Sequence, residues 1–317
     1  MRLQSKIIFK FILALFVFSS ISFGQGEEIK QSNDPLISYG DAMVFGLVEG
    51  VTEFLPISST GHLILTNDWM LDPSSLNEVE KDAVNAYLIV IQAGAILAVA
   101  LLYSRRIFAV LLGFLGLDPV GKKLGFNLLA AFAPAVVLGP LLDQWIESLL
   151  FGPVPVSVAL IVGALLMFWA EKRKRRVDGM DGDTGKTIED LSLKNALMIG
   201  GLQCVAMCPG TSRSMMTIVG GYFAGLSRRH AAEFSFLLGL VTLSAAAGYK
   251  TITQGNTLLE NFKLGPMIFG CLIAGIFAAL SVRWLVGYLS RHGLGIFVWY
   301  RLVLGLFVLV YFGINGT

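Results

Sequence analysis

Two short polar stretches interrupt an otherwise apolar chain. The first, residues 46–65, reads GLVEGVTEFLPISSTGHLIL and contains Glu49, Glu53 and His62. Glu49 and Glu53 are four residues apart, so both carboxylates lie on one face of a helix. Two close carboxylates cannot both ionise cheaply unless a cation lies between them, and hard oxygen ligands favour Mg²⁺ or Ca²⁺. The alternative is a carboxylate pair that faces a water-filled vestibule.

A run of hydroxyl side chains follows the two carboxylates. Ser58, Ser59 and Thr60 come just after Pro56, at an expected break between two helices. Free backbone N–H groups and hydroxyls at such a break form an anion-binding site. They can equally cap the second helix, and the two roles are compatible. His62, two residues further on, is a candidate general acid, general base or nucleophile.

The second polar stretch, residues 208–217, reads CPGTSRSMMT and places Arg213 among hydroxyls. The planar guanidinium group offers paired donors that match a phosphate. The alternative is an internal salt bridge from Arg213 to Glu49 or Glu53. Carboxylates, hydroxyls, a histidine and an arginine together indicate a metal-assisted phosphoryl-transfer site, provided that the two stretches meet.

The composition places this site in a membrane protein. The 317 residues are 55% hydrophobic and 15% charged, with a mean hydropathy of +0.71. These values exclude an ordinary soluble enzyme and predict an all-α protein with several membrane spans. The formal net charge is only +2, and we expect no nucleic-acid partner.

The N-terminus resembles a secretory signal. Residues 1–24 begin with Arg2 and Lys6, continue as an apolar run and end in small residues around Phe23. This pattern predicts a cleaved signal peptide, with a retained extra helix as the alternative. Residues 25–38 would then form a polar tail outside the cytoplasm.

Basic clusters set the expected topology, because they mark the cytoplasmic ends of spans. Six spans satisfy them all: 83–103, 124–142, 153–170, 231–249, 266–285 and 296–312. This works only if residues 40–71 and 195–226 each enter and leave the membrane on one side. Each contains a central proline, Pro56 or Pro209, and each half is too short to cross alone. We therefore predict two re-entrant hairpins that line a cavity.

The two halves of the chain then match as an inverted-topology repeat, each with one re-entrant helical hairpin and three transmembrane helices. The expected units are repeat halves 40–171 and 194–314, a cytoplasmic loop over 172–193, and a single membrane domain over 39–317. A weak likeness aligns Pro56 with Pro209. In such folds the site lies where the broken helices meet near the middle of the membrane.

The motifs that carry this chemistry resemble a known family. Residues 49–62, EGVTEFLPISSTGH, are similar to the first signature of the undecaprenyl-diphosphate phosphatases, the bacitracin-resistance membrane phosphatases. Residues 209–214, PGTSRS, with Thr217 resemble the second signature, although Met215 stands where the family usually has glycine. The resemblance covers roughly residues 40–314. It implies hydrolysis of undecaprenyl diphosphate to the monophosphate and phosphate, which recycles the lipid carrier of cell-wall synthesis and confers bacitracin resistance.

The resemblance also implies the surroundings of the reaction and the roles of residues. It implies dependence on Mg²⁺ or Ca²⁺, a place in the bacterial inner membrane, a site open to the outer face, and a polyprenyl diphosphate substrate; a homodimer is compatible with it. Glu49 and Glu53 would bind the metal. The implied catalytic residues are Glu49, Glu53, Ser59, His62 and Arg213, and the implied phosphate-binding residues are Ser58, Thr60, Gly210, Thr211, Ser212, Arg213, Ser214 and Thr217. The nucleophile stays open.

Two other classes compete with this interpretation. The acid-phosphatase type of lipid phosphatase needs a histidine after Ser-Arg and five further residues, but Val219 stands there. A polyprenyl-phosphate carrier is the stronger alternative, because inverted repeats with broken helices are typical of transporters. A carrier would release no phosphate.

Overall fold

The fold is described from a computed structural model, which covers residues 36–71, 76–150, 152–178, 184–261 and 264–315. The expected signal peptide, 1–24, and nearly all of the expected tail, 25–38, lie outside these ranges. Within them the chain is helical without a strand, apart from an isolated bridge between Lys186 and Leu226. Residues 37–317 form one unit of packed helices.

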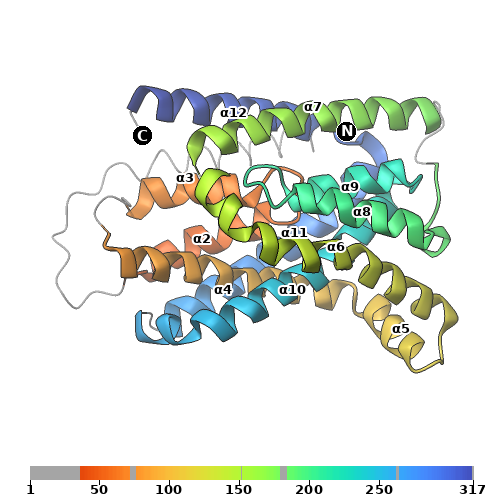
Figure 1. The fold of residues 1–317 in the computed structure, drawn as a ribbon, viewed down its shortest axis with the longest axis horizontal. Coiled ribbons are helices and arrows are strands. Elements are labelled where there is room, and N and C mark those ends of the chain that lie inside the picture. Colours follow the sequence, from red (N-terminus) through yellow and green to blue (C-terminus); the bar gives the residue numbers. More distant parts are fainter. Residues whose placement is uncertain (1–35, 72–75, 151, 179–183, 262–263, 316–317) are drawn as a thin grey trace. The chain divides into compact units, whose positions relative to one another are not determined.

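Six of the described helices are long and apolar enough to cross a membrane, as the sequence predicts. They are α4 (Glu78–Leu102), α6 (Pro119–Leu150), α7 (Pro153–Asp178), α10 (Arg228–Asn261), α11 (Leu264–His292) and α12 (Gly295–Asn315). The protein is therefore a multi-pass helical membrane protein. Figure 1 shows α7 and α12, which pack on each other, along the upper edge of the view.

The ends of several predicted segments were wrong. The first span, predicted from residue 83, begins earlier, because Asn77 and Glu80 form a capping box that starts α4 at Glu78. An unexpected helix, α5 (Ser104–Phe114), follows the first span, and α6 continues beyond residue 142. The cytoplasmic loop expected from 172 begins later, because α7 continues to Asp178; a short 3-10 helix, η2 (Ile188–Asp190), lies in the remainder.

Two helical hairpins accompany the six long helices. The first joins α2 (Tyr39–Thr52) to α3 (Ser59–Leu71), and the second joins α8 (Leu193–Val205) to α9 (Arg213–Phe223). These helices have 14, 13, 13 and 11 residues. At about 1.5 Å per residue, none reaches the roughly 30 Å of a bilayer core. The predicted breaks near Pro56 and Pro209 are thus confirmed.

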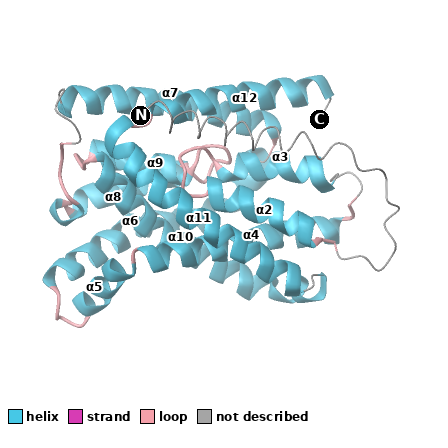
Figure 2. Cartoon of the chain, turned by 180° about the vertical axis from the view of Figure 1, so that it is seen from behind, coloured by secondary structure: helices cyan, strands magenta, loops and turns pink. Residues whose placement is uncertain are grey.

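Glycines hold each hairpin against a long helix. A Cβ at Gly46 or Gly50 of α2 would strike the backbone of α11, at Gly270 or Ala274. A Cβ at Gly200 of α8 would strike the backbone of α6. Close backbone approach through small residues is how helices associate in membranes. The view from behind shows α11 beside α2 and the hairpins beneath α7 and α12 (Figure 2).

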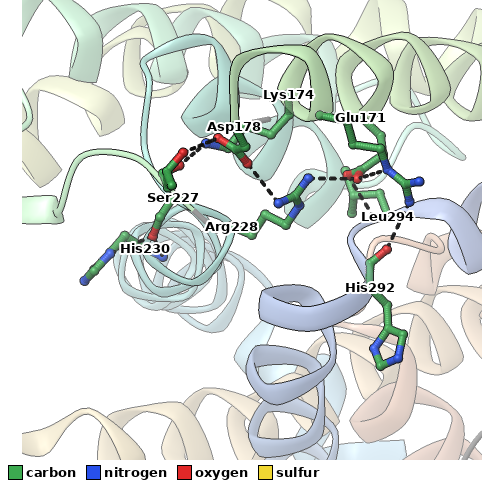
Figure 3. A network of polar contacts seen from close by, with 10 residues as sticks. Glu171, Lys174, Asp178, Ser227, Arg228, His230, His292 and Leu294 are labelled. Atoms are coloured by element: carbon green, nitrogen blue, oxygen red, sulfur yellow. Dashed lines mark hydrogen bonds and ion pairs between the residues drawn. The ribbon is translucent and has the colours of Figure 1, made fainter. Parts of the chain in front are cut away.

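A buried polar network fixes one end of α7 (Figure 3). Arg228, at the start of α10, donates to Asp178 at 2.9 Å and to Glu171 at 3.2 Å. Lys174 donates to Asp178 at 2.7 Å, and Glu171 also accepts from the backbone N–H of Leu294, in the α11–α12 turn. The four charged side chains are each less than a tenth exposed. Lys174, which was expected in the cytoplasmic loop over 172–193, is thus a buried ion-pair partner in α7.

Candidate active site

The two hairpin turns share an unusual backbone. Among the described residues, Ser58 and Ser212 are the two non-glycine residues with positive φ, at 74° and 75°. Each precedes the second helix of its hairpin, and each side chain accepts from the backbone N–H three residues on, Gly61 or Met215. Backbone strain of this kind persists where the surroundings enforce it, and it is concentrated at functional sites. The predicted capping role of Ser58 is confirmed.

Glu53 joins the two motifs, although they lie 160 residues apart. Arg213 donates from Nη2 to Oε1 of Glu53 at 2.9 Å, and Ser59 donates from Oγ to Oε2 at 2.7 Å. The Glu53 and Arg213 side chains are 6% and 13% exposed, which makes this a largely desolvated ion pair. A second guanidinium nitrogen of Arg213 donates to the carbonyl of Ser235 in α10. The prediction that the two polar stretches meet is confirmed, and the internal salt bridge considered for Arg213 is present.

Glu49 is the anomalous carboxylate of the site. It is fully buried, and neither of its oxygens has a hydrogen-bond partner among the described residues. Its charged neighbours are Glu53 and Arg213. A buried carboxylate without a donor or a cation is costly, so the residues present fit a bound cation.

The protein supplies only part of a metal shell. No group of three or more histidine, cysteine, aspartate or glutamate side chains in the described ranges could hold a metal ion. Glu49 and Glu53 would therefore need water and substrate oxygens to complete the shell. Mg²⁺ commonly binds in this way, through one or two carboxylates and the phosphates of a substrate.

Several expected phosphate ligands are engaged within the protein. Ser214 donates to the carbonyl of Leu55 in the first turn at 2.8 Å and lies 3.1 Å from the hydroxyl of Ser212. Thr217 lies 2.6 Å from the hydroxyl of Ser235 and also bonds to the carbonyl of Arg213. These hydroxyls therefore join the two turns and α10 to one another.

The remaining expected phosphate ligands differ in exposure and conformation. Gly210 has φ +89°, and a Cβ there would strike the backbone of Val156 in α7. Thr211 is buried, with its backbone N–H bonded to Cys208, whereas Thr60 is only partly buried. Gly210 is thus required by the conformation of the turn, and Thr60 is the more accessible of the two threonines.

His62 is turned toward α12. Its Nδ1 lies 2.7 Å from the carbonyl of Ser58, and its Nε2 lies 2.5 Å from the hydroxyl of Tyr300. The rings of His62 and Tyr300 are stacked, with centroids 5.6 Å apart and planes 5° from parallel. In this structure His62 therefore bonds to the first turn and to α12, and neither bond goes to Glu49, Glu53 or Arg213.

Two residues of α12 were missed by the sequence reasoning, Tyr300 and its neighbour Arg301. Arg301 is fully buried and donates to the carbonyls of Gly210, Ala159 and Leu160, while its Nη1 has no partner in the described part of the chain. An arginine inside the span predicted over 296–312 was itself a signal, because ionisable residues within membranes are costly and usually functional. Nothing in the sequence marks Tyr300.

Fold and site together define a multi-pass helical membrane protein with a buried glutamate–arginine–serine cluster between two broken hairpins. The family described as "Bacitracin resistance protein BacA" matches residues 42–307, and the chain belongs to it. The match leaves out the N-terminal segment, as the motif resemblance also did.

Curated relatives span almost the whole of this match. "Undecaprenyl-diphosphatase 1" of Chromobacterium violaceum is 45% identical over 269 residues, which is 84% of this chain and 94% of the relative. "Undecaprenyl-diphosphatase 2" of Rhodospirillum rubrum is 47% identical over 268 residues, 84% and 93% of the two chains. "Undecaprenyl-diphosphatase" of Acinetobacter baumannii is 44% identical over 269 residues, 85% and 94% of the two chains.

Proposed function

We propose that this protein hydrolyses undecaprenyl diphosphate to undecaprenyl phosphate and inorganic phosphate. This reaction recycles the lipid carrier of cell-wall synthesis, and it links the chain to bacitracin resistance as in its family. The observation that carries the proposal is the buried contact of Glu53 with both Arg213 and Ser59, beside the unpartnered carboxylate of Glu49. Relatives that are 44–47% identical to this chain are named for this activity, which supports the proposal.

The geometry assigns roles to the residues of the cluster. Arg213 presents paired donors to a phosphoryl group. Arg301 donates to the carbonyl of Gly210 and so places its positive charge next to the second turn. Glu53 accepts the proton of the attacking group, which is the Ser59 hydroxyl or a water held in its place. The phosphoanhydride bond breaks, and undecaprenyl phosphate leaves with the proton that Glu53 had accepted. Where Ser59 attacks, water then attacks the phosphoserine; Glu53 accepts a proton from this water and returns it to the serine oxygen as phosphate leaves.

A divalent cation, Mg²⁺ or Ca²⁺, is the proposed cofactor. Glu49 and Glu53 would hold it, and it would neutralise the charge of the diphosphate. This cofactor is supported by the two buried oxygens of Glu49, which have no hydrogen-bond partner among the described residues. A hard cation could bind them and take its other ligands from water and substrate.

We infer that the fold is an inverted repeat, from equivalent positions in the two hairpins. The helix-capping serines Ser38 and Ser192 are 154 positions apart, as are Gly46 and Gly200. The positive-φ serines, Ser58 and Ser212, have the same separation. This shift aligns Pro56 with Gly210, one residue beyond the expected partner Pro209.

Packing between the halves supports the same inference. The hairpin helix α2 packs on α11, and α8 packs on α6. Each hairpin thus contacts the second long helix of the other half. Three crossings per half would start the second half on the opposite side, which makes the repeat inverted. With the basic clusters in the cytoplasm of a bacterium, the first hairpin and the site would open to the outer face of the inner membrane.

Phosphate release from undecaprenyl diphosphate by detergent-purified protein tests the proposal, with and without a chelator. We expect release that the chelator abolishes and that Mg²⁺ or Ca²⁺ restores. Release that resists the chelator would keep the phosphatase and remove the metal. No release from folded protein in the presence of the cations would overturn the proposal in favour of a polyprenyl-phosphate carrier, which the inverted repeat would also suit.

A further inference from the structure

We propose that Tyr300 is a positioning residue for His62, which holds its imidazole in one orientation. The inference rests on the proposed function for its kinetic effect, but its structural content can be measured without any activity. Tyr300 lies on α12, the last helix of the second half, whereas His62 lies on α3, in the first hairpin. The pair therefore joins segments 238 positions apart in the sequence.

The two hydrogen bonds of His62 determine its protonation pattern. A backbone carbonyl only accepts, so the Nδ1 that faces Ser58 must carry a hydrogen. In the neutral ring Nε2 is then the acceptor, and the hydroxyl of Tyr300 is its donor. The parallel stacking of the two rings restricts rotation of the imidazole as well. The basic nitrogen of His62 is thus Nε2, and the Tyr300 hydroxyl controls where its lone pair points.

The backbone around His62 supports a positioning role. The carbonyl that fixes Nδ1 belongs to Ser58, whose strained φ of 74° begins α3. One position beyond Tyr300, Arg301 donates to the carbonyl of Gly210 in the other turn at 2.9 Å. Consecutive residues of α12 therefore contact α3 of the first hairpin and the turn of the second. A side chain that merely filled space beside His62 would not need a hydroxyl directed at its Nε2.

Tyr300→Phe tests the inference, because it removes the hydroxyl and keeps the stacked ring. The chain offers a matched control in Tyr288, which also stacks on a histidine, His292, with centroids 4.6 Å apart and planes at 17°. The full-length protein would be purified in detergent as wild type, Tyr300→Phe and Tyr288→Phe. Each would be assayed for kcat and KM of phosphate release from undecaprenyl diphosphate.

Nitrogen-15 NMR of histidine-labelled protein supplies the second measurement. The chain has only three histidines, so each imidazole can be assigned by substitution. We expect wild-type His62 to show hydrogen on Nδ1 with Nε2 as acceptor. Tyr300→Phe should shift the Nε2 signal of His62, which loses its donor, while Nδ1 keeps its hydrogen on the Ser58 carbonyl. It should also lower kcat by about 10- to 100-fold with KM within about twofold, as misplacement of a catalytic group does. Tyr288→Phe should leave the His62 signals and kcat unchanged.

The outcomes separate this inference from the proposed function. An active wild type, with Tyr300→Phe unchanged in both kcat and the His62 spectrum, would overturn the positioning role. A changed spectrum with unchanged kcat would overturn it as well, because the orientation of His62 would not matter to the reaction. If the wild type releases no phosphate, the proposed function fails, while the spectrum still decides whether Tyr300 donates to Nε2 of His62.

Discussion

Glu49→Met separates the stability of the site from its activity. Glu49 is fully buried, and both of its oxygens lack a partner among the described residues. Leaving a buried polar group unpaired costs about 1–3 kcal/mol in proteins. Methionine has a similar length and no such cost. We therefore expect Glu49→Met to raise the free energy of unfolding by about 1–3 kcal/mol in chelator, a rise in Tm of roughly 2–10 °C.

With saturating divalent cations, the wild type should instead unfold at a higher temperature than Glu49→Met. A cation that binds only the folded wild type adds about 2.7 kcal/mol at a free concentration one hundred times its Kd. Glu49→Met should lose that cation-dependent rise in Tm, together with phosphate release. Thermal unfolding in chelator, Mg²⁺ and Ca²⁺, followed by the phosphate assay, measures both effects.

Gln203 provides a matched control for this experiment. It lies 154 positions after Glu49, is 4% exposed, and has no partner for either atom of its amide among the described residues. Gln203→Met should therefore raise Tm in chelator and keep the wild-type response to cations. An equal cation response in Glu49→Met and the wild type would refute metal binding by Glu49. A lower Tm of Glu49→Met in chelator would refute the claim that its carboxylate is unpaired.

Three further substitutions test the site and the fold. Arg213→Lys keeps the charge beside Glu53 but removes the paired donors, so kcat/KM should fall about 10- to 100-fold; wild-type kinetics would contradict the phosphate-binding role. Ser59→Ala should lower kcat about 1000-fold or more if the serine attacks, and only about tenfold if it holds a water; no change would remove it from the mechanism. Arg228→Met removes the buried cation that pairs with both Asp178 and Glu171, so thermal unfolding should show a loss of about 3–5 kcal/mol, and an unchanged Tm would contradict the role assigned to the network.

The fold was largely predictable because its signals are local. Apolar length gave the six spans, and a proline with following hydroxyls located the break in each hairpin. The proposed repeat differs by one residue from the expected match of Pro56 with Pro209, because that match rests on residue type. The proposed register rests on backbone conformation, with a positive φ at both Ser58 and Ser212. No sequence pattern predicts a positive φ at a serine.

Only the part of the site that consists of charged residues was predictable from the sequence. Glu53 and Arg213 could be paired in advance because unpaired charges in a membrane are costly. The hydroxyls of Ser214 and Thr217 could not be assigned, because a hydroxyl serves a phosphate or a carbonyl equally well, and packing decides between them. Tyr300 comes from a distant helix, and although Arg301 beside it is a signal, nothing in the sequence pairs the tyrosine with His62, so only the packed structure identifies it.

Under the proposed function, the contact between Glu53 and Arg213 would link substrate binding to metal binding. In this structure Arg213 and Ser59 occupy both oxygens of Glu53. A phosphoryl group that takes the guanidinium donors releases Oε1 of Glu53, which can then join Glu49 as a cation ligand. Binding of diphosphate and of cation should therefore be mutually favourable, and linkage requires the same factor in both directions. Mg²⁺ affinity measured calorimetrically should rise on addition of a non-hydrolysable diphosphate lipid. In Glu53→Gln the two affinities should become independent, because its amide cannot replace the released carboxylate oxygen; equal coupling there would place the link outside this ion pair.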